Sequence, residues 1–285
     1  LYFLINIIYW WYYLKIFIFS KKTLLIFSLI IIFIFIFCVA LHNYYFTKSK
    51  LVSNNNLSLD TFINNVQNLT NGKEKVAYLT FDDGPNLQIT PKVLDILKSE
   101  DVKATFFVIG KYVDEHPEIV KRAYDEGHFI ANHSYSHDNS ILYKSSEAFI
   151  NEIQKTDKAI GNALGIENYT SHLFRFPNGF MAPLYKSEKE KATLLLSQMD
   201  YAYIDWNALN NDSMQKYSSS QLLANLKESI KNKNTLVILM HDTKDVSNSS
   251  LVLKDSIEYL KSQGYEFKNF YSWSLNGLWA IVFSE

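Results

Sequence analysis

Residues 76–109 read VAYLTFDDGPNLQITPKVLDILKSEDVKATFFVI and predict a strand, a helix and a second strand in succession. The two ends, 76–81 and 104–109, are short apolar runs rich in β-branched and aromatic residues, as buried strands are. Between them, residues 91–100 carry apolar side chains at helical spacing. A strand, a helix and a strand in this order favour two parallel strands covered by a helix, because parallel neighbours need a long crossover connection.

The same alternation continues along the chain. Further apolar runs lie at 128–132, 173–176, 202–206, 236–240 and 265–270, and helical patterns lie at 117–126, 145–164, 184–198, 219–231 and 249–263. Seven strands that alternate with helices predict an α/β fold with a mainly parallel sheet. Periodicity leaves an open doubly wound sheet and an incomplete barrel as alternatives. In both, functional residues are expected where strands end and loops begin.

The composition excludes several classes of protein. The 285 residues include 28 Lys and Arg against 29 Asp and Glu, so no excess charge favours binding to nucleic acid. An apolar share of 48% excludes disorder of the whole chain. The one cysteine, Cys38, excludes an internal disulfide framework and a cysteine-rich zinc site.

Apolar residues are concentrated near the start of the sequence. The run 24–41 has 18 residues, long enough as a helix to cross a bilayer, and it predicts a transmembrane signal anchor rather than a buried core helix. Three lysines precede this run and two follow it, which favours a single-pass topology with a cytoplasmic N-terminus. The rest of the chain is then expected outside the cell membrane.

The segments around this run also have distinct compositions. Residues 1–23 are expected to be a cytoplasmic segment, or to be partly untranslated if synthesis starts at Leu14. Residues 42–74, rich in Asn, Ser and Lys, predict a tether with one short helix near 59–66. A folded domain is expected at 75–275.

Four of the predicted strands run directly into polar motifs. These are Thr80-Phe81-Asp82-Asp83-Gly84-Pro85, His133-Ser134-Tyr135-Ser136-His137, Arg175-Phe176-Pro177-Asn178-Gly179 and Leu239-Met240-His241-Asp242. Because the carboxyl ends of parallel strands meet at one edge of a sheet, the side chains of these motifs are expected on one face of the domain.

His133 and His137 are spaced to bind one metal ion. Residues four apart lie on one face of a helical turn, and a nearby aspartate would complete a His₂Asp set with open positions. Such a set suits a catalytic zinc or a non-haem iron, whereas an isolated pair is an ordinary surface feature. Asp82 and Asp83 offer one ligand and one base, or else form a solvated turn.

Arg175 and His241 are the other two candidates for chemistry. Arg122 and Arg175 are the only arginines among the 28 basic residues. Arg175 is therefore expected to orient a carboxylate rather than to lie at the surface. His241 ends an apolar strand, where a histidine is either a core residue or, beside activated water, a general acid.

Taken together, these motifs resemble those of polysaccharide deacetylases of the NodB-homology type, carbohydrate esterase family 4, over about residues 75–270. T-F-D-D-G-P, H-S-Y-S-H, R-F-P and L-M-H match four motifs of that family in their order. The resemblance implies a distorted (β/α) barrel of about seven parallel strands. It also implies removal of acetyl groups from N-acetylated sugars with a divalent metal ion, Zn²⁺ with Co²⁺ or Ni²⁺ as alternatives.

The resemblance further implies a role for each matched residue. Asp82 is the general base, oriented by Arg175, and His241 is the general acid. The metal ligands are Asp83, His133 and His137. The residues expected at the substrate are Trp206 and Leu239, as walls of the acetyl pocket, and Asn178, whose backbone N–H helps to bind the oxyanion where the family has a tyrosine.

Two further positions depart from the family's pattern. Asp138 follows the second histidine, where proline is common. Of the family's W-x-x-D-x-x-D-W motif, only Trp206 and Asp212 are kept. Asp212 is therefore the candidate partner of His241, with Asp205 as its rival. These departures concern substrate preference more than catalysis.

These expectations combine into a membrane-anchored, monomeric N-deacetylase of cell-wall glycan, with peptidoglycan N-acetylglucosamine as substrate and no nucleic-acid partner. The alternatives are a deacetylase of chitin oligomers or O-acetylated polysaccharide, a catalytically silent glycan-binding module and a His₂-carboxylate iron oxygenase. Asp82 argues against the oxygenase, which needs no base beside its ligands. The presence of both Asp82 and His241 argues against the silent module.

Overall fold

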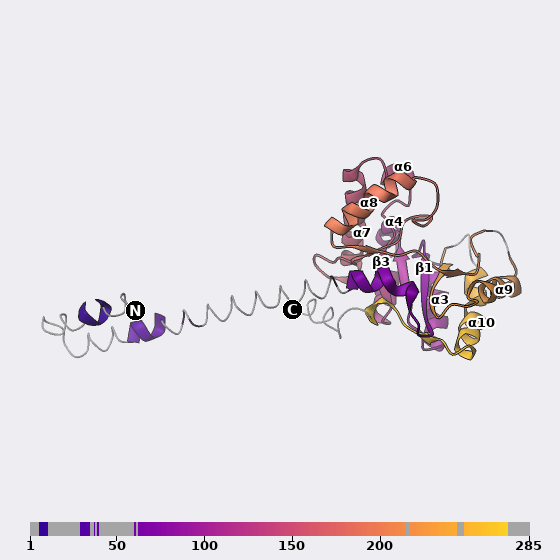
Figure 1. Ribbon diagram of the computed structural model, residues 1–285, viewed down its shortest axis with the longest axis horizontal. Coiled ribbons are helices and arrows are strands. Elements are labelled where there is room, and N and C mark those ends of the chain that lie inside the picture. Colours follow the sequence, from indigo (N-terminus) through magenta and orange to yellow (C-terminus); the bar gives the residue numbers. More distant parts are fainter. Residues whose placement is uncertain are drawn as a thin grey trace. The chain divides into compact units, whose positions relative to one another are not determined.

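The computed structural model describes residues 6–10, 29–34, 37, 39, 60, 62–214, 217–243 and 248–272 (Figure 1). The chain divides into two compact units, Leu1–Leu57 and Ser58–Glu285, and every predicted site residue belongs to the second. In the first unit, residues 6–10 and 29–34 are helical and expose apolar side chains. Among the described residues no helix is both long and apolar enough to cross a bilayer. Most of the expected anchor, 24–41, lies outside those residues.

Parallel strands form the centre of the second unit. Their order is β5-β4-β3-β2-β1-β7-β6, and β8 pairs with the start of β1. Among the described residues this path of seven parallel strands ends at β5 and β6, so the sheet is a curled half-barrel rather than a closed barrel, with β8 as an eighth parallel strand beside β1. The bounds are β1 Val76–Asp82, β2 Thr105–Val108, β3 Phe129–Asn132, β4 Leu173–Phe174, β5 Ala202–Tyr203, β6 Ala208–Leu209, β7 Thr235–His241 and β8 Glu266–Phe267.

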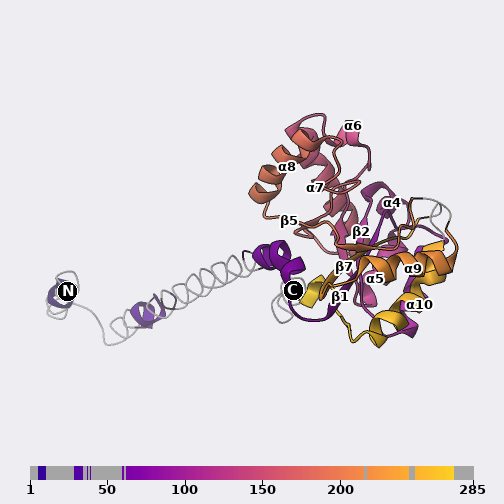
Figure 2. The same cartoon turned by 45° about the vertical axis from the view of Figure 1, so that its right-hand side comes forward.

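Helices connect the strands and cover the sheet (Figure 2). Polar residues at their ends fix where several begin: Ser145 accepts a hydrogen bond from the Ala148 N–H at the start of α7, and Ser218 and Gln221 form a capping box at the start of α9. Residues 62–68 are helical. The other bounds are η1 Leu69–Asn71, α3 Thr90–Ser99, α4 Gly110–Glu115, α5 Pro117–Asp125, α6 Asn139–Leu142, α7 Ser146–Leu164, α8 Lys186–Gln198, α9 Ser219–Ser229, α10 Asn248–Ser262 and η3 Phe270–Ser272.

Three short elements, α4, α6 and β6, go beyond the sequence expectations. Each spans six residues or fewer, too short for a periodic pattern to show. Strand β6 depends on a side chain: the Asn207 amide donates to the Thr235 backbone oxygen at 2.8 Å and accepts from the Val237 N–H at 2.8 Å. These bonds hold the start of β6 against β7. A strand made this way has no signal in a hydrophobic pattern.

The two faces of β1 belong to different cores. Ala77, Leu79 and Phe81 pack in a cluster with helices α3, α5 and α10. Val76 and Tyr78 pack in a second cluster with residues of β2, β3, β4, β5 and β7, which is the concave side of the half-barrel. Because side chains alternate along a strand, Thr80 and Asp82 face this concave side too. Strand geometry therefore places Asp82 inside the half-barrel, at its carboxyl end.

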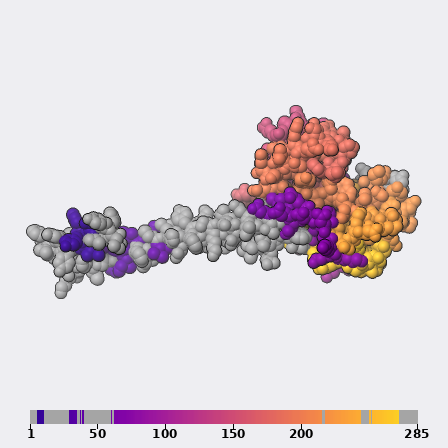
Figure 3. Space-filling model, viewed as in Figure 1, coloured from indigo at the N-terminus to yellow at the C-terminus, as the bar shows by residue number. Residues whose placement is uncertain are grey.

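The folded unit begins earlier than the expected boundary at residue 75. Within the expected tether, Phe62, Val66 and Leu69 are buried and belong to the concave cluster with Tyr78 and Phe270. Figure 3 shows this part of the chain in purple against the rest of the second unit. The spacing of the three buried residues, four and three positions, puts them on one side of a helical path. Residues 62–71 are therefore part of the domain, because they cover apolar surface that strands β1 and β7 leave at their amino ends.

This boundary predicts a difference between two truncated chains. Full burial of one large apolar side chain contributes roughly 1.5–3 kcal/mol, and the ordering of about ten residues offsets part of that gain. A chain of residues 75–285 should therefore unfold with a free energy about 2 kcal/mol or more below that of residues 58–285. Urea unfolding followed by circular dichroism measures both. Equal unfolding free energies would show that residues 62–71 do not stabilise the domain.

Candidate active site

Asp82 ends β1 and is held by a buried arginine. Arg175, directly after β4, is fully buried, and its Nη1 donates to Asp82 Oδ1 at 2.8 Å and to Thr80 Oγ1 at 2.6 Å. A planar guanidinium fixes a carboxylate in one orientation. The other carboxylate oxygen, Asp82 Oδ2, lies 3.9 Å from His133 Nε2. The expected contact between Arg175 and Asp82 is present, and it leaves one oxygen of Asp82 facing the histidines.

Asp83, His133 and His137 converge on one point. Asp83 Oδ1 lies 3.3 Å from His133 Nε2 and 3.2 Å from His137 Nε2, and the three potential ligand atoms lie within 4.8 Å of one another. His133 Nδ1 is 2.8 Å from the backbone oxygen of Arg175. Since a carbonyl only accepts, Nδ1 carries a proton in either protonation state, and Nε2 is the nitrogen that faces the cluster.

The pKa values of Asp83 and His137 favour the protonation states that bind a cation, an ionised carboxylate and a neutral imidazole. Burial raises the pKa of Asp83, but its interactions with His133 and the charge of His137 outweigh burial and hold the pKa well below its usual range. Burial, aided by the charge of His133, lowers the pKa of His137 to about 4, so this imidazole is neutral at neutral pH. Burial also lowers the pKa of His133, but the negative charges of Asp82 and Asp83 outweigh it and raise the pKa. A cation would replace the proton on His133.

The three residues therefore fit a divalent metal ion. Asp83 Oδ1 is buried without a conventional hydrogen-bond partner among the described residues, and a buried carboxylate oxygen needs either a donor or a cation. Two imidazole nitrogens and one carboxylate are a ligand set that zinc and similar ions accept with positions left open.

His241, the last residue of β7, is held by Asp212. Its Nδ1 lies 2.7 Å from Asp212 Oδ1, and its backbone N–H donates to Asp212 Oδ2 at 2.9 Å. Burial lowers the pKa of His241, but the hydrogen bond and charge of Asp212, with the charges of Asp82 and Asp83, outweigh it and raise the pKa to about 9. His241 is therefore protonated at neutral pH and carries a proton that it can donate.

Asp205, the rival partner of His241, has another task. Its carboxylate accepts from the Phe180 N–H at 2.8 Å and the Met181 N–H at 3.1 Å, and its backbone oxygen accepts from Arg175 Nη2 at 3.2 Å. Lys189 holds the same loop from α8, because its buried Nζ donates to the Gly179 oxygen at 2.6 Å. Asp205 and Lys189 together fix the loop that carries Asn178.

Two of the three predicted substrate residues lie beside Arg175 or its partner Thr80, and the third, Asn178, lies in the loop after Arg175. Asn178 is exposed and has φ of 64°, so the turn it starts suits Asn followed by Gly. The Trp206 ring packs on Gly179, where a Cβ atom would be 2.8 Å from the ring. Leu239 pairs with Thr80 across β7 and β1. The contacts of all three residues with a substrate stay predictions.

Asp242 is a buried carboxylate that the motif analysis left without a role. Its Oδ2 accepts from Thr90 Oγ1 at 2.6 Å, and burial raises its pKa to about 7. It also lies directly behind the Asp82–Pro85 turn: a Cβ atom on Gly84 would be 2.3 Å from Asp242 Oδ2. This close approach explains the need for glycine at that position. The one hint of Asp242 in the sequence is its position directly after the buried strand that ends at His241.

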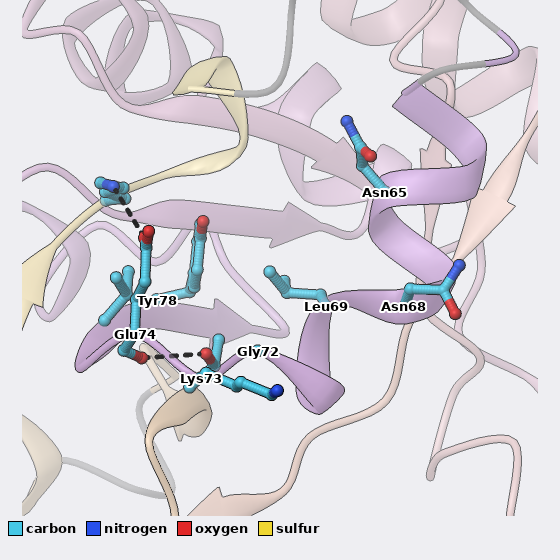
Figure 4. Close-up of a pocket in the computed structure, with 10 residues that line it drawn as sticks. Asn65, Asn68, Leu69, Gly72, Lys73, Glu74 and Tyr78 are labelled. Carbon is cyan, nitrogen blue, oxygen red and sulfur yellow. Dashed lines mark hydrogen bonds and ion pairs between the residues drawn. The ribbon is translucent and has the colours of Figure 1, made fainter.

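A separate pocket of about 520 Å³ lies away from these groups (Figure 4). Its lining includes Asn65, Asn68 and Leu69 from the segment before β1, with Tyr78 from β1 and Thr235 from β7. It therefore lies at the amino ends of β1 and β7, whereas Asp82 and His241 lie at their carboxyl ends. The described lining has none of the histidines or aspartates discussed above.

Comparison with known proteins shows which family the chain resembles. The sequence model of the family Polysaccharide deacetylase matches residues 70–203. A peptidoglycan-N-acetylglucosamine deacetylase of Bacillus cereus is 36% identical over 212 residues, 70% of this chain and 71% of that protein. The peptidoglycan-N-acetylmuramic acid deacetylase PdaA of Bacillus subtilis is 33% identical over 201 residues, 70% of this chain and 72% of that protein.

A solved structure gives the same result. A CE4 esterase of Streptococcus mutans superposes with a TM-score of 0.65 at 30% identity, covering 73% of this chain and 90% of that one. The chain therefore belongs to the polysaccharide deacetylase family and is a hydrolase of that class.

Proposed function

We propose that this protein removes N-acetyl groups from N-acetylglucosamine residues of a cell-wall glycan, with peptidoglycan as the polymer. One observation carries the proposal: a carboxylate fixed by Arg175 and a protonated imidazole fixed by Asp212 lie side by side on one face of the sheet, because Asp82 and His241 are partners in the register of β1 and β7. Hydrolysis of an amide needs such a base and such an acid. The names of both relatives specify peptidoglycan, and they differ in the sugar.

The residues that would hold the metal ion are Asp83, His133 and His137, with Zn²⁺ the expected ion and Co²⁺ or Ni²⁺ as alternatives. When bound, such an ion supplies Lewis acidity that activates water and polarises the acetyl carbonyl.

The chain's own groups then move the protons. Asp82 Oδ2 accepts a proton from the attacking water as the new C–O bond forms at the acetyl carbon. The exposed Asn178 N–H donates to the oxyanion. His241 gives its proton to the sugar nitrogen as the C–N bond breaks, which leaves acetate and a free amine. Trp206 and Leu239 enclose the acetyl methyl group.

The raised pKa of His241 predicts the alkaline limb of the activity profile. An acid works only while protonated, so kcat/KM should fall as pH rises through a value near 9, lowered to the extent that a bound cation repels the proton. Asp212→Asn removes the charge that raises this pKa. Its alkaline limb should therefore move down by about one pH unit or more.

Asp205→Asn is the matched control for Asp212→Asn, because Asp205 binds the Phe180–Met181 backbone instead of His241. Its alkaline limb should stay in place even if its rate falls. His241→Ala should remove the limb, and should slow amide substrates more than activated esters, whose leaving groups need no proton. An unchanged alkaline limb in His241→Ala would exclude His241 as the acid.

The substrate is tested by acetate release. The zinc-loaded chain is incubated with peptidoglycan, chitin oligomers and acetylxylan, and acetate and new free amines are measured. We expect acetate from peptidoglycan, with the new amine on glucosamine after acid hydrolysis. Acetate from chitin oligomers alone would identify a deacetylase of chitin oligomers. Acetate from acetylxylan alone would identify a deacetylase of O-acetylated polysaccharide. No acetate from any of the three substrates would favour the catalytically silent glycan-binding module.

We further propose that residues 24–41 anchor the protein in the cell membrane, with a monomeric catalytic unit outside the cell. The support is the length and apolar character of that run. The full chain should pellet with membranes after a high-salt wash, and residues 58–285 should not. Pelleting of the shortened chain would show that another segment binds lipid.

A further inference from the structure

The segment between the two histidine ligands has an unusual backbone. Ser134 and His137 both have left-handed conformations, with φ of 66° and 55°. Residues other than glycine rarely adopt this region, which costs of order 1 kcal/mol or more each, and they remain there only where surrounding contacts hold them. The loop Ser134–Ser136, which sets the separation of His133 and His137, must therefore be held from outside.

Glu152 holds this loop from α7. It is 4% exposed, and its Oε2 accepts three hydrogen bonds: from the Tyr135 N–H at 3.1 Å, the Ser136 N–H at 2.8 Å and Ser136 Oγ at 2.7 Å. Hydrogen bonds to an ionised acceptor are roughly twice as strong as neutral ones. One buried carboxylate oxygen thus binds two successive backbone N–H groups between the metal ligands.

Helix α4 holds the carbonyl side of the same loop. The N–H groups of Gly110 and Lys111 donate to the backbone oxygens of Ser134 and Tyr135, each at 3.0 Å. Lys111 Nζ donates to the Ser136 oxygen at 3.1 Å. These groups would remain if Glu152 were changed, so the carboxylate can be removed without releasing both sides of the loop.

We propose that Glu152 is a positioning residue that sets the metal affinity of the Asp83–His133–His137 site. It acts through the backbone: by fixing Tyr135 and Ser136 it holds His137 against His133 before a cation arrives. Without it, the cation must order the loop when it binds, and that cost reduces affinity. The inference rests on the proposed metal site but not on the identity of the glycan.

The expected effect is on metal binding first. Loss of outer groups that orient metal ligands costs about 10–100-fold in affinity. Glu152→Gln keeps the shape of the side chain but loses its charge, and Glu152→Ala loses all three hydrogen bonds. The Zn²⁺ dissociation constant should rise about tenfold or more in Glu152→Gln and further in Glu152→Ala. Saturating zinc should restore most of kcat.

The experiment measures Zn²⁺ affinity of the full chain by competition with a chelating dye, without substrate. The Co²⁺ absorption spectrum reports ligand geometry on the same samples. Glu147→Gln is the matched control, because Glu147 is an exposed residue in the first turn of α7. If Glu152→Ala does not fold, Glu152→Gln and Ser136→Ala still decide the question, since Ser136→Ala deletes one of the three bonds.

Two results would overturn the proposal. One is a Zn²⁺ dissociation constant for Glu152→Gln equal to that of Glu147→Gln. The other is a lower melting temperature with unchanged affinity and an unchanged Co²⁺ spectrum, which would make Glu152 a residue of the fold alone. Failure of the whole protein to release acetate would affect neither measurement, so the two proposals fail separately.

Discussion

Replacing Asp83, His133 or His137 by alanine should abolish metal retention and acetate release while the fold persists. Each residue supplies one of three ligand atoms that lie within 4.8 Å of one another, so the loss of one leaves two ligands and an open site. The three lie at or just after the ends of β1 and β3, above a packed sheet. Their removal should therefore leave most of the core undisturbed.

Elemental analysis after gel filtration measures this result, with circular dichroism to show that each variant is folded. His116→Ala is a suitable control, since His116 lies between α4 and α5, outside the metal cluster. It should retain metal at the wild-type ratio. Full metal content in His137→Ala would show that His137 is not a ligand.

Asp82→Asn should lower kcat by about 10²–10⁴-fold, the usual contribution of a general base, while metal stays bound. An amide has nearly the shape of the carboxylate but cannot take the proton from water. The metal ligand next to it, Asp83, is unchanged. Asp125→Asn, at an exposed residue of α5 that pairs with Lys121, is a control for loss of one carboxylate. Loss of metal from Asp82→Asn would make Asp82 a ligand rather than the base.

The fold could be predicted where its elements are long. Strands β1 and β7 each span seven residues with almost uninterrupted burial, and runs of this kind show in any hydrophobic pattern. The position of the four motifs could be predicted for the same reason, because polar residues that directly follow a buried strand lie at its carboxyl end. In the expected tether, the predicted short helix near 59–66 is present as residues 62–68, but it packs on the domain. Phe62, Val66 and Leu69 stand in a polar, Asn-rich segment, and only the sheet beneath them makes them core residues.

The supports of the site could not be predicted from the sequence. The hydrogen bond from Thr90 to Asp242 joins residues 152 positions apart in the sequence. Nothing in the sequence distinguishes Lys189 from the other lysines, and only the structure shows its bond to the Gly179 oxygen. Local structure decides between Asp212 and Asp205. The Asp212 N–H donates to Asn210 Oδ1 at 3.0 Å in the turn after β6, which directs Asp212 to His241. A two-residue strand without a sequence signal thus determines which aspartate contacts His241.

We propose that Asp82 and His241 hydrolyse the N-acetyl amide of a cell-wall glycan beside a metal site. The decisive experiment compares zinc-loaded wild type and zinc-loaded Asp82→Asn on peptidoglycan, with acetate and free glucosamine amines measured in the same samples. We expect one new amine per acetate in the wild type, and a rate at least about a hundredfold lower in Asp82→Asn at equal zinc content. Acetate without new amines, or equal rates for the two proteins, would contradict this proposal.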